Sequence, residues 1–413
     1  MIYRAITDAE IPIVADIQSR AFRTQADGYV THYREGGRYD WRAVRLLEDD
    51  EGQAVAALTI FERLMSLNGG QLAAGLIASV GVPPEQRRRG YARRLMIGLL
   101  EELHRQRLPV SLLYPFSTAF YRSLGYGLAN MNWFLDIPPR ELPDFPERLA
   151  VRRATPGDEP AIRACYERAR RQPHHNGWFK RTDWEWHHRV WKPERETVVY
   201  VGEGTIAGYL IYTLTADWER GVNPVKVIEW VTTSDAAWRG LLGFLAALGE
   251  QATVISYNAP QGTPLLAALR EPYSDVGGRA EFVYTQAARL VVGFMLRVTH
   301  LPTALRGRHF PPAVAANFVL QVDDPQLAGN SEAAHVHITN GAASVAPASG
   351  PFGRGQSATV ETDIATFSQL FTGITTAEQA RSLGRLNADD ETCALLTAAF
   401  AAAPLYLHQS DWF

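Results

Sequence analysis

The chain has 413 residues, of which 46% are hydrophobic and 21% charged, and its formal net charge is −3 at pH 7. This composition is typical of a globular protein, and the length predicts two or three domains. The small net charge gives no reason to expect binding to nucleic acid or to an anionic membrane. Because Cys165 and Cys393 cannot form a disulfide framework, we expect a reducing compartment.

The N-terminal residues lack the architecture of a signal peptide, and no apolar run is long enough to span a bilayer. We therefore expect a cytoplasmic protein without a membrane partner. Residues 3–10 are predicted to form a short strand and a capping turn, and the apolar spacing of residues 11–21 predicts a helix after them.

The most informative segment begins with an apolar run at residues 76–82, which is typical of a buried strand. An arginine-rich turn with Gly90 follows, and then an apolar-periodic run to about residue 103 indicates a helix. The first turn of a helix favours an anion, Gly90 lets the backbone approach it, and Arg87 and Arg88 could add charge-assisted bonds. The segment predicts a diphosphate site; the alternative is a solvated basic turn before a surface helix.

The next strand is expected at residues 110–114, and a short helix at residues 117–124 is expected to end at Gly125. Tyr121 lies on this helix and Tyr126 directly after its end. Both could be core aromatics at the edge of a sheet, and we expect this of Tyr126. A phenol placed beside a thioester sulfur could also supply a proton as thiolate forms.

Two local patterns resemble the GCN5-related N-acetyltransferases. Arg87-x-x-Gly90-x-Ala92 is similar to their acyl-CoA pyrophosphate loop, and residues 120–126 fit their aromatic-Tyr-x-x-x-Gly-aromatic segment. The resemblance implies that acetyl-CoA is the co-substrate and that Tyr121 protonates the leaving thiolate. It also implies a set of cofactor-binding positions, in which Val80 and Val82 pair their backbone groups with the pantetheine arm: Val80, Val82, Arg87, Arg88, Gly90, Tyr91 and Ala92.

A faint internal repeat predicts a second domain of the same kind. Residues 151–159 repeat the pattern of residues 3–10, and the proline-rich residues 137–149 are expected to link the copies. Strand signals recur at residues 197–201, 206–214 and 225–232. At the place of the loop, residues 234–243 lack the arginines and the Arg-x-x-Gly-x-Ala spacing, and the helix at 240–248 is apolar nearly all round. The sequence thus predicts domains at 1–136 and 150–286, the second without acetyl-CoA.

From residue 287 the pattern changes to an α+β domain that extends to residue 413. Residues 287–298 are expected to form an apolar strand and residues 301–305 to begin a short helix. Strands are expected at residues 316–322, 334–339, 343–346 and 358–362, and helices at 364–371 and 391–401. This third domain resembles the sterol-carrier-protein fold, so the fold class is α+β, with two acetyltransferase domains in tandem and a carrier-like domain after them.

Together the three domains resemble the Eis (enhanced intracellular survival) family over essentially the whole chain. Further marks of this resemblance are residues 293–298 and the ending Asp411-Trp412-Phe413. The resemblance implies acetylation of primary amines of aminoglycoside-type cations, or of lysine side chains, and a homo-oligomer that is typically a hexamer. It also implies that the α-carboxylate of Phe413 enters the first domain as the general base, anchored by its own ring and by Trp412; the alternative is a frayed terminus.

The acceptor pocket is expected beneath a polar loop after the first helix. Asp27 and Trp41, with Glu35 and Asp40 beside them, could bind the cationic acceptor together with Trp412; the alternative for each is a solvated loop residue. Trp412 and this loop depart from the family's namesake branch, which argues against broad multi-acetylation of aminoglycosides.

Histidine pairs at residues 174–175, 187–188 and 335/337 lack carboxylate or cysteine partners at ligand spacing, so no metal is expected. The aromatic cluster at residues 178–191 is expected to form core or subunit interface. The leading hypothesis is an acetyl-CoA-dependent N-acetyltransferase for a small cationic amine. The alternatives are a protein-lysine acetyltransferase, a lipid-binding or interaction module with vestigial acetyltransferase domains, and a long-chain acyltransferase.

Overall fold

The structure is a computed structural model that describes residues 1–36, 40–215, 223–249, 251–272, 279–281, 284–348 and 358–413. These residues form two compact units. The first unit contains residues 1–129, 293–403 and 413, and the second contains residues 130–292 and 404–412.

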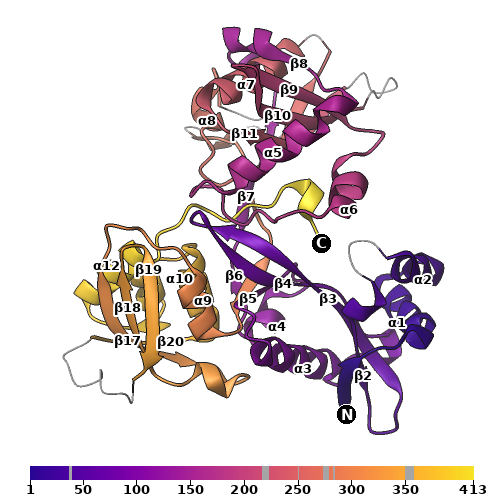
Figure 1. Ribbon diagram of the computed structural model, residues 1–413, viewed down its shortest axis with the longest axis vertical. Helices are drawn as coiled ribbons and strands as arrows, with labels where there is room; N and C mark the ends of the chain where they lie inside the picture. Colours follow the sequence, from indigo (N-terminus) through magenta and orange to yellow (C-terminus); the bar gives the residue numbers. More distant parts are fainter. Residues whose placement is uncertain (37–39, 216–222, 250, 273–278, 282–283, 349–357) are drawn as a thin grey trace. The chain divides into compact units, whose positions relative to one another are not determined.

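The first unit begins with a seven-stranded sheet in the order β1-β2-β3-β4-β5-β16-β6, in which β4 and β5 run parallel. Helices α1 and α2 cover one face and α3 covers the other (Figure 1), because each helix contributes an apolar stripe to the core on its own side. The strands are β1 Ile2–Ala5, β2 Val44–Glu48, β3 Ala54–Leu67, β4 Gly70–Gly81, β5 Val110–Leu113, β16 Met295–Val298 and β6 Gly127–Leu128; the helices are α1 Ile11–Phe22, α2 Ala26–Glu35, α3 Tyr91–Arg105 and α4 Thr118–Arg122.

The sheet of the second unit repeats this order as β8-β9-β10-β11-β12-β7-β15, again with its fourth and fifth strands parallel. Helix α5 covers one face and α7 the other. A small hairpin of β13 and β14 also belongs to this unit. Its elements are β7 Met131–Ile137, β8 Val151–Arg153, α5 Glu159–Arg170, α6 Asp183–Glu185, β9 Glu196–Gly202, β10 Thr205–Leu214, β11 Pro224–Thr232, α7 Asp235–Ala247, β12 Val254–Pro260, α8 Leu265–Ala268, β13 Arg279–Glu281, β14 Tyr284–Thr285 and β15 Arg289–Val292.

The predicted internal repeat is confirmed down to its capping bonds. Thr7 and Glu10 form a capping box before α1, and Thr155 and Asp158 form the same box before α5. Arg4 also pairs with the Glu10 carboxylate, and Arg152 pairs with Asp158 at 2.7 Å. The faint sequence similarity therefore reflects two copies of one strand–turn–helix unit.

Two strands do not follow the domain boundaries expected from the sequence. Strand β7 begins within residues 1–136 but pairs with β12 in the second sheet, whereas β16 lies in the expected third domain but pairs with β5 in the first sheet. The single strand expected at residues 287–298 is in fact β15 and β16, and the break at residues 293–294 sends them to different sheets. The first sheet thus gains β16, and the second gains β7 and β15, from beyond the expected domain boundaries.

The proline-rich segment expected to be a linker is part of the second domain's core. Leu142 is buried and Phe145 packs against the same apolar cluster as α7. A Cβ at Gly243 of α7 would lie 2.9 Å from the Phe145 carbonyl oxygen, so the helix needs a glycine to approach this segment. Two apolar anchors therefore fix a stretch whose composition alone suggested a connection.

The carrier-like domain has a five-stranded sheet in the order β19-β18-β17-β20-β21, with α9, α10 and α12 packed against its strands (Figure 1). Its expected strands and helices are all present, and α11 and β21 are additional. The elements are α9 Leu301–Gly307, β17 Ala316–Asp323, β18 Ala334–Thr339, β19 Ala342–Pro347, β20 Ala358–Asp363, α10 Ile364–Thr372, α11 Ala377–Ser382, β21 Leu386–Asn387 and α12 Asp390–Ala399.

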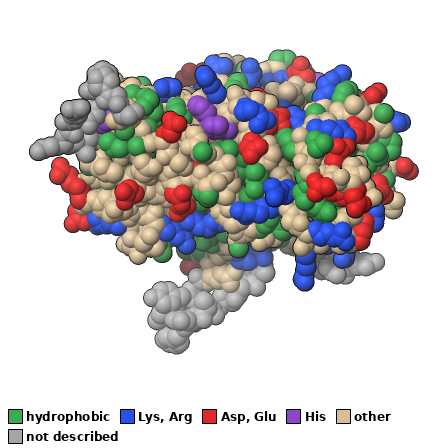
Figure 2. Space-filling model, turned by 90° about the horizontal axis from the view of Figure 1, so that it is seen from below, with side chains coloured by type: hydrophobic (Ala, Val, Ile, Leu, Met, Phe, Trp, Pro, Cys, Tyr) green, Lys and Arg blue, Asp and Glu red, His purple; other side chains and the backbone are tan. Residues whose placement is uncertain are grey.

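On the face shown in Figure 2, Lys and Arg side chains are interspersed with Asp and Glu side chains. Within the described ranges, no helix combines the length and the apolar character that a membrane span requires.

Candidate active site

The predicted diphosphate loop connects β4 to α3. Two residues in it, Arg88 (φ 63°) and Gly90 (φ 84°), adopt left-handed backbone conformations, and Gly90 is the N-cap of α3. Within the described part of the chain no side chain caps this helix, so the first-turn N–H groups after Gly90 lack the acceptor that a capping side chain would supply. The turn therefore presents free donors and the positive end of a 15-residue helix to an anion.

A cleft of about 650 Å³ lies directly in front of this helix end. All seven residues predicted to bind the cofactor line it, together with aromatic and small side chains from α1 and from the segment around α4. The lining residues are Ala21, Phe22, Val80, Val82, Gln86, Arg87, Arg88, Gly90, Tyr91, Ala92, Arg93, Phe116 and Phe120. The cleft combines backbone donors at one end with apolar walls, which suits a diphosphate joined to a less polar arm.

The arginines of the loop differ in their contacts. Arg87 donates to the carbonyl oxygens of Val82 at 3.3 Å and Ala21 at 3.2 Å, so it braces the loop against β4 and α1. Arg88 is exposed at the cleft, and Arg93 donates to the Ser123 hydroxyl at 3.0 Å. Arg88 is therefore placed to reach a diphosphate bound in the cleft.

Strands β4 and β5 separate beside the cleft. Their parallel pairing ends at Ile77 and Leu113, although β4 continues to Gly81. At this point Ser79 has a φ of 53°, and the register of β4 against β3 shifts. The divergence leaves backbone groups of β4 unpaired with β5, and Val80 and Val82 extend from there along the cleft.

Tyr121 lies on α4, on the α3 side of this divergence. Ser117 caps α4 by accepting the Phe120 N–H at 3.3 Å, which fixes the start of the short helix. The Tyr121 side chain is 2% exposed, and its ring contacts those of Phe116 and Phe120 at 5.3 and 5.0 Å between centroids. Its hydroxyl has no hydrogen-bond partner among the described residues, and burial raises the pKa of Tyr121 above its ordinary value.

Tyr126 is a core residue, as expected. Its hydroxyl lies 2.8 Å from the Ser111 hydroxyl, and the side chain is completely buried. Burial raises the pKa of Tyr126 to about 12. Because its polar group is satisfied inside the core, Tyr126 supports the Tyr121 ring from behind, at 5.9 Å between centroids.

The turn after α4 is held by Arg297, whose guanidinium is in turn paired with Asp324 of the carrier-like domain; sequence analysis missed this link. Arg297 on β16 donates to the Leu124 carbonyl oxygen and pairs with Asp324, and both side chains are fully buried. A Cβ at Gly125 would lie 1.9 Å from the Arg297 guanidinium, so only glycine fits beside this pair. Arg122 on α4 also pairs with Asp363 at 3.1 Å.

On the opposite face of the sheet, a polar network and an aromatic group lie on the α1–α2 side. The Tyr33 hydroxyl donates to Gln18 Oε1 at 2.5 Å and lies 3.1 Å from the Thr59 hydroxyl. Gln18 in turn donates to the Ser79 carbonyl oxygen at 3.2 Å. Helices α1 and α2 are therefore tied to the strained residue of β4 where the strands diverge.

Phe413 belongs to the aromatic group on this face. Its ring centroid lies 6.2 Å from that of Phe61 on β3 and 5.2 Å from that of Tyr114, which follows β5. Arg63, two residues beyond Phe61 on the same face of β3, places its guanidinium carbon 5.0 Å from the Phe61 ring. The last residue of the chain is thus packed, and a guanidinium lies over one of its aromatic neighbours.

The other residues expected around the acceptor are more scattered. Asp27 is exposed in the first turn of α2, and Trp41 is partly buried against the α1–α2 core, with Arg42 over its ring at 4.8 Å. Asp40 accepts from Arg42 at 2.7 Å. Trp412 lies in the second unit, where its carbonyl oxygen accepts from Arg189 at 2.6 Å.

The loop of the second domain has a different design. Ser234 caps α7 by accepting the Ala237 N–H at 3.2 Å, so this helix start is satisfied by its own side chain. A Cβ at Gly240 would lie 2.5 Å from the Tyr200 ring and 3.1 Å from the Glu147 carbonyl oxygen. The first half of α7 is therefore covered by the chain, and it presents no arginine turn to a diphosphate.

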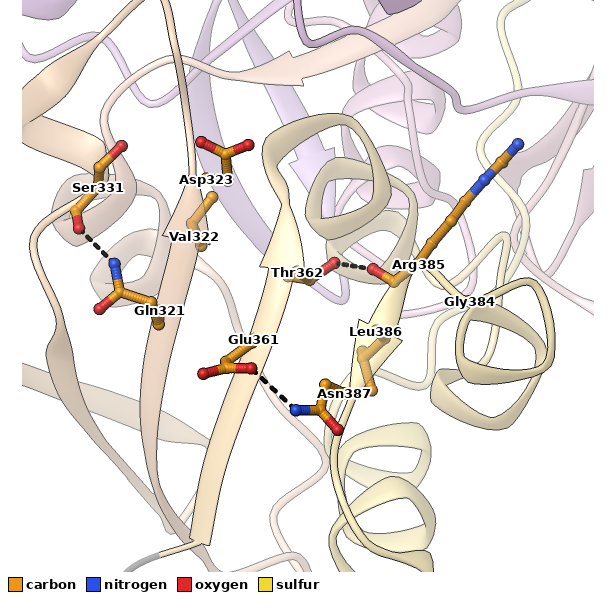
Figure 3. Close-up of a pocket in the computed structure, with 10 residues that line it drawn as sticks. All are labelled: Gln321, Val322, Asp323, Ser331, Glu361, Thr362, Gly384, Arg385, Leu386 and Asn387. Atoms are coloured by element: carbon orange, nitrogen blue, oxygen red, sulfur yellow. Dashed lines mark hydrogen bonds between the residues drawn. The ribbon is translucent and has the colours of Figure 1, made fainter.

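The carrier-like domain carries a hollow of about 550 Å³ beside β17, β20 and β21 (Figure 3). Glu361 and Asn387 point toward each other across it and form a hydrogen bond of 2.8 Å, and Gln321 donates to the Ser331 carbonyl oxygen at 2.7 Å. On the helical side of the sheet, Phe318, Phe367 and Phe371 are fully buried. The hollow is thus lined by polar and charged side chains together with Val322 and Leu386.

Across the described ranges, no three His, Cys, Asp or Glu side chains are grouped so as to hold a metal ion. Trp178, Phe179 and Trp186 of the aromatic cluster are buried, and the two tryptophans pack in the α5 side of the second domain.

Comparisons with known proteins agree with this architecture. Models of acetyltransferase (GNAT) domains match residues 2–129 and residues 177–298, and a sterol carrier protein domain matches residues 301–408. The chain belongs to the GCN5-related N-acetyltransferases. As an enzyme it is an acetyl-CoA-dependent N-acetyltransferase, whose first domain carries the loop and cleft described above.

Several proteins resemble this enzyme in sequence or in structure. An uncharacterized N-acetyltransferase of Streptomyces griseus is 27% identical over 312 residues, 68% of this chain and 70% of the relative. A GCN5-related N-acetyltransferase from Anabaena variabilis has 22% identity and a TM-score of 0.82, covering 98% of both chains. Eis1 from Mycobacterium abscessus has 19% identity and a TM-score of 0.77, covering 100% of both chains. The two solved structures share its fold.

Proposed function

We propose that this Eis-like enzyme transfers acetyl from acetyl-CoA directly to a primary amine of a small cationic molecule of the aminoglycoside type. The observation that carries the proposal is the divergence of β4 and β5. Tyr121 lies on the α3 side of the divergence, and the Phe413 ring packs against Phe61 and Tyr114 on the α1–α2 side. A thioester at the divergence would have a proton donor and a carboxylate on opposite faces.

The residues of the cleft fit the co-substrate. Acetyl-CoA supplies an activated acyl group and a thiolate leaving group. The N–H groups after Gly90 and the Arg88 guanidinium would bind its diphosphate, and backbone groups of Val80 and Val82, beyond the β4–β5 pairing, would bind the pantetheine amides. A backbone N–H of β4 would polarise the thioester oxygen.

Tyr121 would act as the donor to sulfur. Because burial raises its pKa, the phenol stays protonated throughout the physiological range and is kept as a hydrogen-bond donor. As the C–S bond breaks, its hydroxyl hydrogen passes to the sulfur, and the phenol regains a proton from solvent. The products are the acetylated amine and the free thiol.

Phe413 would supply the base. The acceptor must lose a proton before its nitrogen can form the new C–N bond, and an ordinary α-carboxyl with a pKa near 3.5 is a weak base. Its carboxylate would attract the cationic amine and take the proton directly or through water. The edge-to-face contact of its ring with Phe61 and the tilted contact with Tyr114 support this role, because they order a residue that would otherwise fray.

The acceptor range is expected to be narrow. Arg63 brings a positive charge next to Phe61 on the acceptor face, while Asp27 is exposed on α2. Because Trp412 and the segment around Asp27 depart from the family's namesake branch, we expect acetylation at one position rather than many. Trp41 and Trp412 are proposed as flanking apolar contacts, and a homo-oligomer, with the hexamer first, is the proposed assembly.

Release of CoA from acetyl-CoA, measured with aminoglycosides, polyamines and lysine peptides, tests the proposal. We expect turnover of a small amine by the native chain. A variant with one glycine added after Phe413 keeps the ring but moves the carboxylate, so it should bind acetyl-CoA normally and turn over slowly. Turnover of lysine peptides alone would favour the protein-lysine alternative, and the absence of acetyl-CoA binding would exclude the assignment of the cleft.

A further inference from the structure

The C-terminal segment, residues 404–412, is built into the second acetyltransferase domain (Figure 1). Leu405 pairs with Asn176 in a β-bridge, and the Tyr406 N–H donates to the Asn176 carbonyl oxygen at 2.9 Å. The Tyr406 hydroxyl donates to the Asn258 carbonyl oxygen at 2.7 Å, and its ring joins the apolar core beneath α5. Residues 405–408 are each at most 4% exposed.

The domain is shaped to receive this segment. Gly177 has a φ of 89°, and a Cβ there would lie 2.8 Å from the Tyr406 carbonyl oxygen and 2.9 Å from its nitrogen. Asn130 donates from Nδ2 to the Leu405 carbonyl oxygen at 2.5 Å. His408 is fully buried among aromatic rings, with Trp178 at 4.3 Å between centroids. The backbone of the segment therefore has hydrogen-bond partners in this domain, and the His408 ring is enclosed by aromatic side chains.

A buried guanidinium recognises the acidic residue of the segment. Arg181 donates to both oxygens of Asp411, at 2.7 and 2.8 Å, and to both oxygens of Glu229, at 2.9 and 2.7 Å. The side chains of Arg181 and Glu229 are 0% exposed and that of Asp411 is 3% exposed. Bidentate pairing of one guanidinium with two carboxylates fixes direction as well as distance.

Further contacts extend to the penultimate residue. Arg189 donates to the carbonyl oxygens of Trp412 at 2.6 Å and Ser410 at 3.4 Å, and Arg195 donates to the Ser410 hydroxyl at 3.2 Å. Because Phe413 is joined directly to Trp412, these contacts limit the positions open to the terminal carboxylate.

The segment lies on the α5 face of the second domain's sheet. The two acetyltransferase sheets have the same strand order, so the α5 face of the second corresponds to the α1 face of the first. In the first domain that face carries Phe61 and the proposed acceptor site. In the second, Tyr406 is packed with α5, β10 and β11 residues on that face.

We propose that the second acetyltransferase domain is a receptor for the chain's own C-terminal segment, in which Arg181, backed by Glu229, binds the carboxylate of Asp411. Arg181 and Asp411 are then positioning residues for the terminal carboxylate. The binding of the segment by this domain is argued from the contacts above. The effect of that binding on catalysis rests on the proposed role of the Phe413 carboxylate.

The test uses Asp411→Asn in the full chain. The amide cannot bind Arg181 through two charged oxygens. Arg181 and Glu229 still balance each other's charge, so this variant should destabilise the fold less than removal of Arg181. Carboxypeptidase A releases C-terminal aromatic residues. The rate at which it removes them, followed by the intact mass of the protein over time, measures how often the tail is detached from the domain. We expect Phe413 and Trp412 to be released at least about tenfold faster than from the native chain. The reason is that weaker binding of the tail raises the population of detached tail, which is the form that the protease cleaves.

Asp324→Asn is the matched control, because it breaks an equally buried bidentate Arg–Asp pair away from the tail. It should release the last residues at the native rate. If Asp411→Asn does not fold, Arg189→Gln tests the same tail from a partly exposed side chain and should also accelerate release. If folded Asp411→Asn releases Phe413 and Trp412 at the native rate, the proposal that the second domain binds the C-terminal segment is wrong.

Steady-state kinetics separate the receptor from the catalytic role. If the second domain binds the segment and the Phe413 carboxylate acts in catalysis, Asp411→Asn lowers kcat while the KM for acetyl-CoA is unchanged. Asp411→Glu then restores part of kcat. Faster release with native kcat would support the receptor and overturn the role of the Phe413 carboxylate. Native release with lowered kcat would overturn the receptor.

Discussion

Arg297 and Asp324 form a bidentate ion pair of 2.7 and 2.8 Å with no exposed surface, and the same guanidinium binds the carbonyl oxygen of Leu124 beside the Tyr121 helix. The carrier-like domain thereby fixes a turn of the first acetyltransferase domain. The relationship gives this domain a defined structural role in the catalytic half of the molecule, independent of any lipid.

Asp324→Asn should lower the free energy of unfolding by about 3 kcal/mol, because a buried guanidinium loses its charged partner. Denaturant unfolding followed by tyrosine and tryptophan fluorescence measures this. Asp16→Asn, in the exposed pair with Arg20, serves as the control and should leave the midpoint unchanged. Equal effects of the two substitutions would contradict the buried pair's role.

Gly125 and Gly90 both have a φ of 84° but should respond differently to alanine. At Gly125 the new Cβ would strike Arg297, so Gly125→Ala should fold poorly or lose at least about 3 kcal/mol of stability. At Gly90 the space is open, so Gly90→Ala should cost only about 1 kcal/mol of backbone strain while weakening acetyl-CoA binding. Thermal unfolding and calorimetric titration with CoA distinguish the two outcomes.

Tyr121→Phe removes the proposed donor to sulfur without changing the buried ring. We expect kcat to fall about 10²-fold with little change in acetyl-CoA affinity. Because burial raises the pKa of Tyr121, the native enzyme should not lose activity through its ionisation up to about pH 9. A basic limb of the pH–rate profile that disappears in Tyr121→Phe would show that the phenol ionises lower than expected.

Acid should destabilise the second unit through His175. Its ring stacks on Trp178 at 4.3 Å, and burial lowers the pKa of His175 to about 4. Unfolded histidine, with a pKa near 6.5, binds more protons below that pH, so stability is full above pH 6.5 and falls between 6.5 and 4. We expect a loss of about 2 kcal/mol at pH 4.5.

The pH dependence of the unfolding midpoint checks this assignment. His175→Phe should flatten the curve between pH 6.5 and 4.5 even though its stability at pH 7 changes, since the hydrogen bond to the Ala169 carbonyl oxygen is lost. His174→Phe, at the exposed neighbour, should keep the native slope. An unchanged slope in His175→Phe would assign the acid sensitivity to other groups.

The sequence predicted the cofactor half of the candidate site because its signals are local. Strand, arginine turn and helix follow one another in the loop that ends at Gly90, and Tyr121 lies on a helix with its own cap and glycine stop. Residues adjacent in the chain carry each of these signals, so periodicity and spacing are enough to locate them.

Strand exchange between the sheets was not predictable in this way. An apolar run at residues 287–298 looks continuous, and nothing in its composition shows that β15 and β16 pair with different sheets. Strand partners depend on contacts far apart in the sequence, which a local pattern does not contain. The packing of Leu142 in the supposed linker was, by contrast, open to prediction from its apolar anchors.

The sequence contains only part of the information needed to predict that the second domain binds the C-terminal segment. Glu229 is a charged residue in the middle of an apolar strand, which indicates a buried partner. Its partner Arg181 and the second carboxylate, Asp411, are separated by 230 positions, so only the folded structure brings them together.

The central claim is that the carboxylate of Phe413 acts in acetyl transfer. The most direct measurement compares kcat for the best amine between the native chain and a semisynthetic chain that ends in the Phe413 carboxamide. The amide keeps the ring on Phe61 and Tyr114 but has no carboxylate, so we predict a fall in kcat of at least about 10²-fold with an unchanged KM for acetyl-CoA. A carboxamide enzyme that turns over at the native rate would contradict the account.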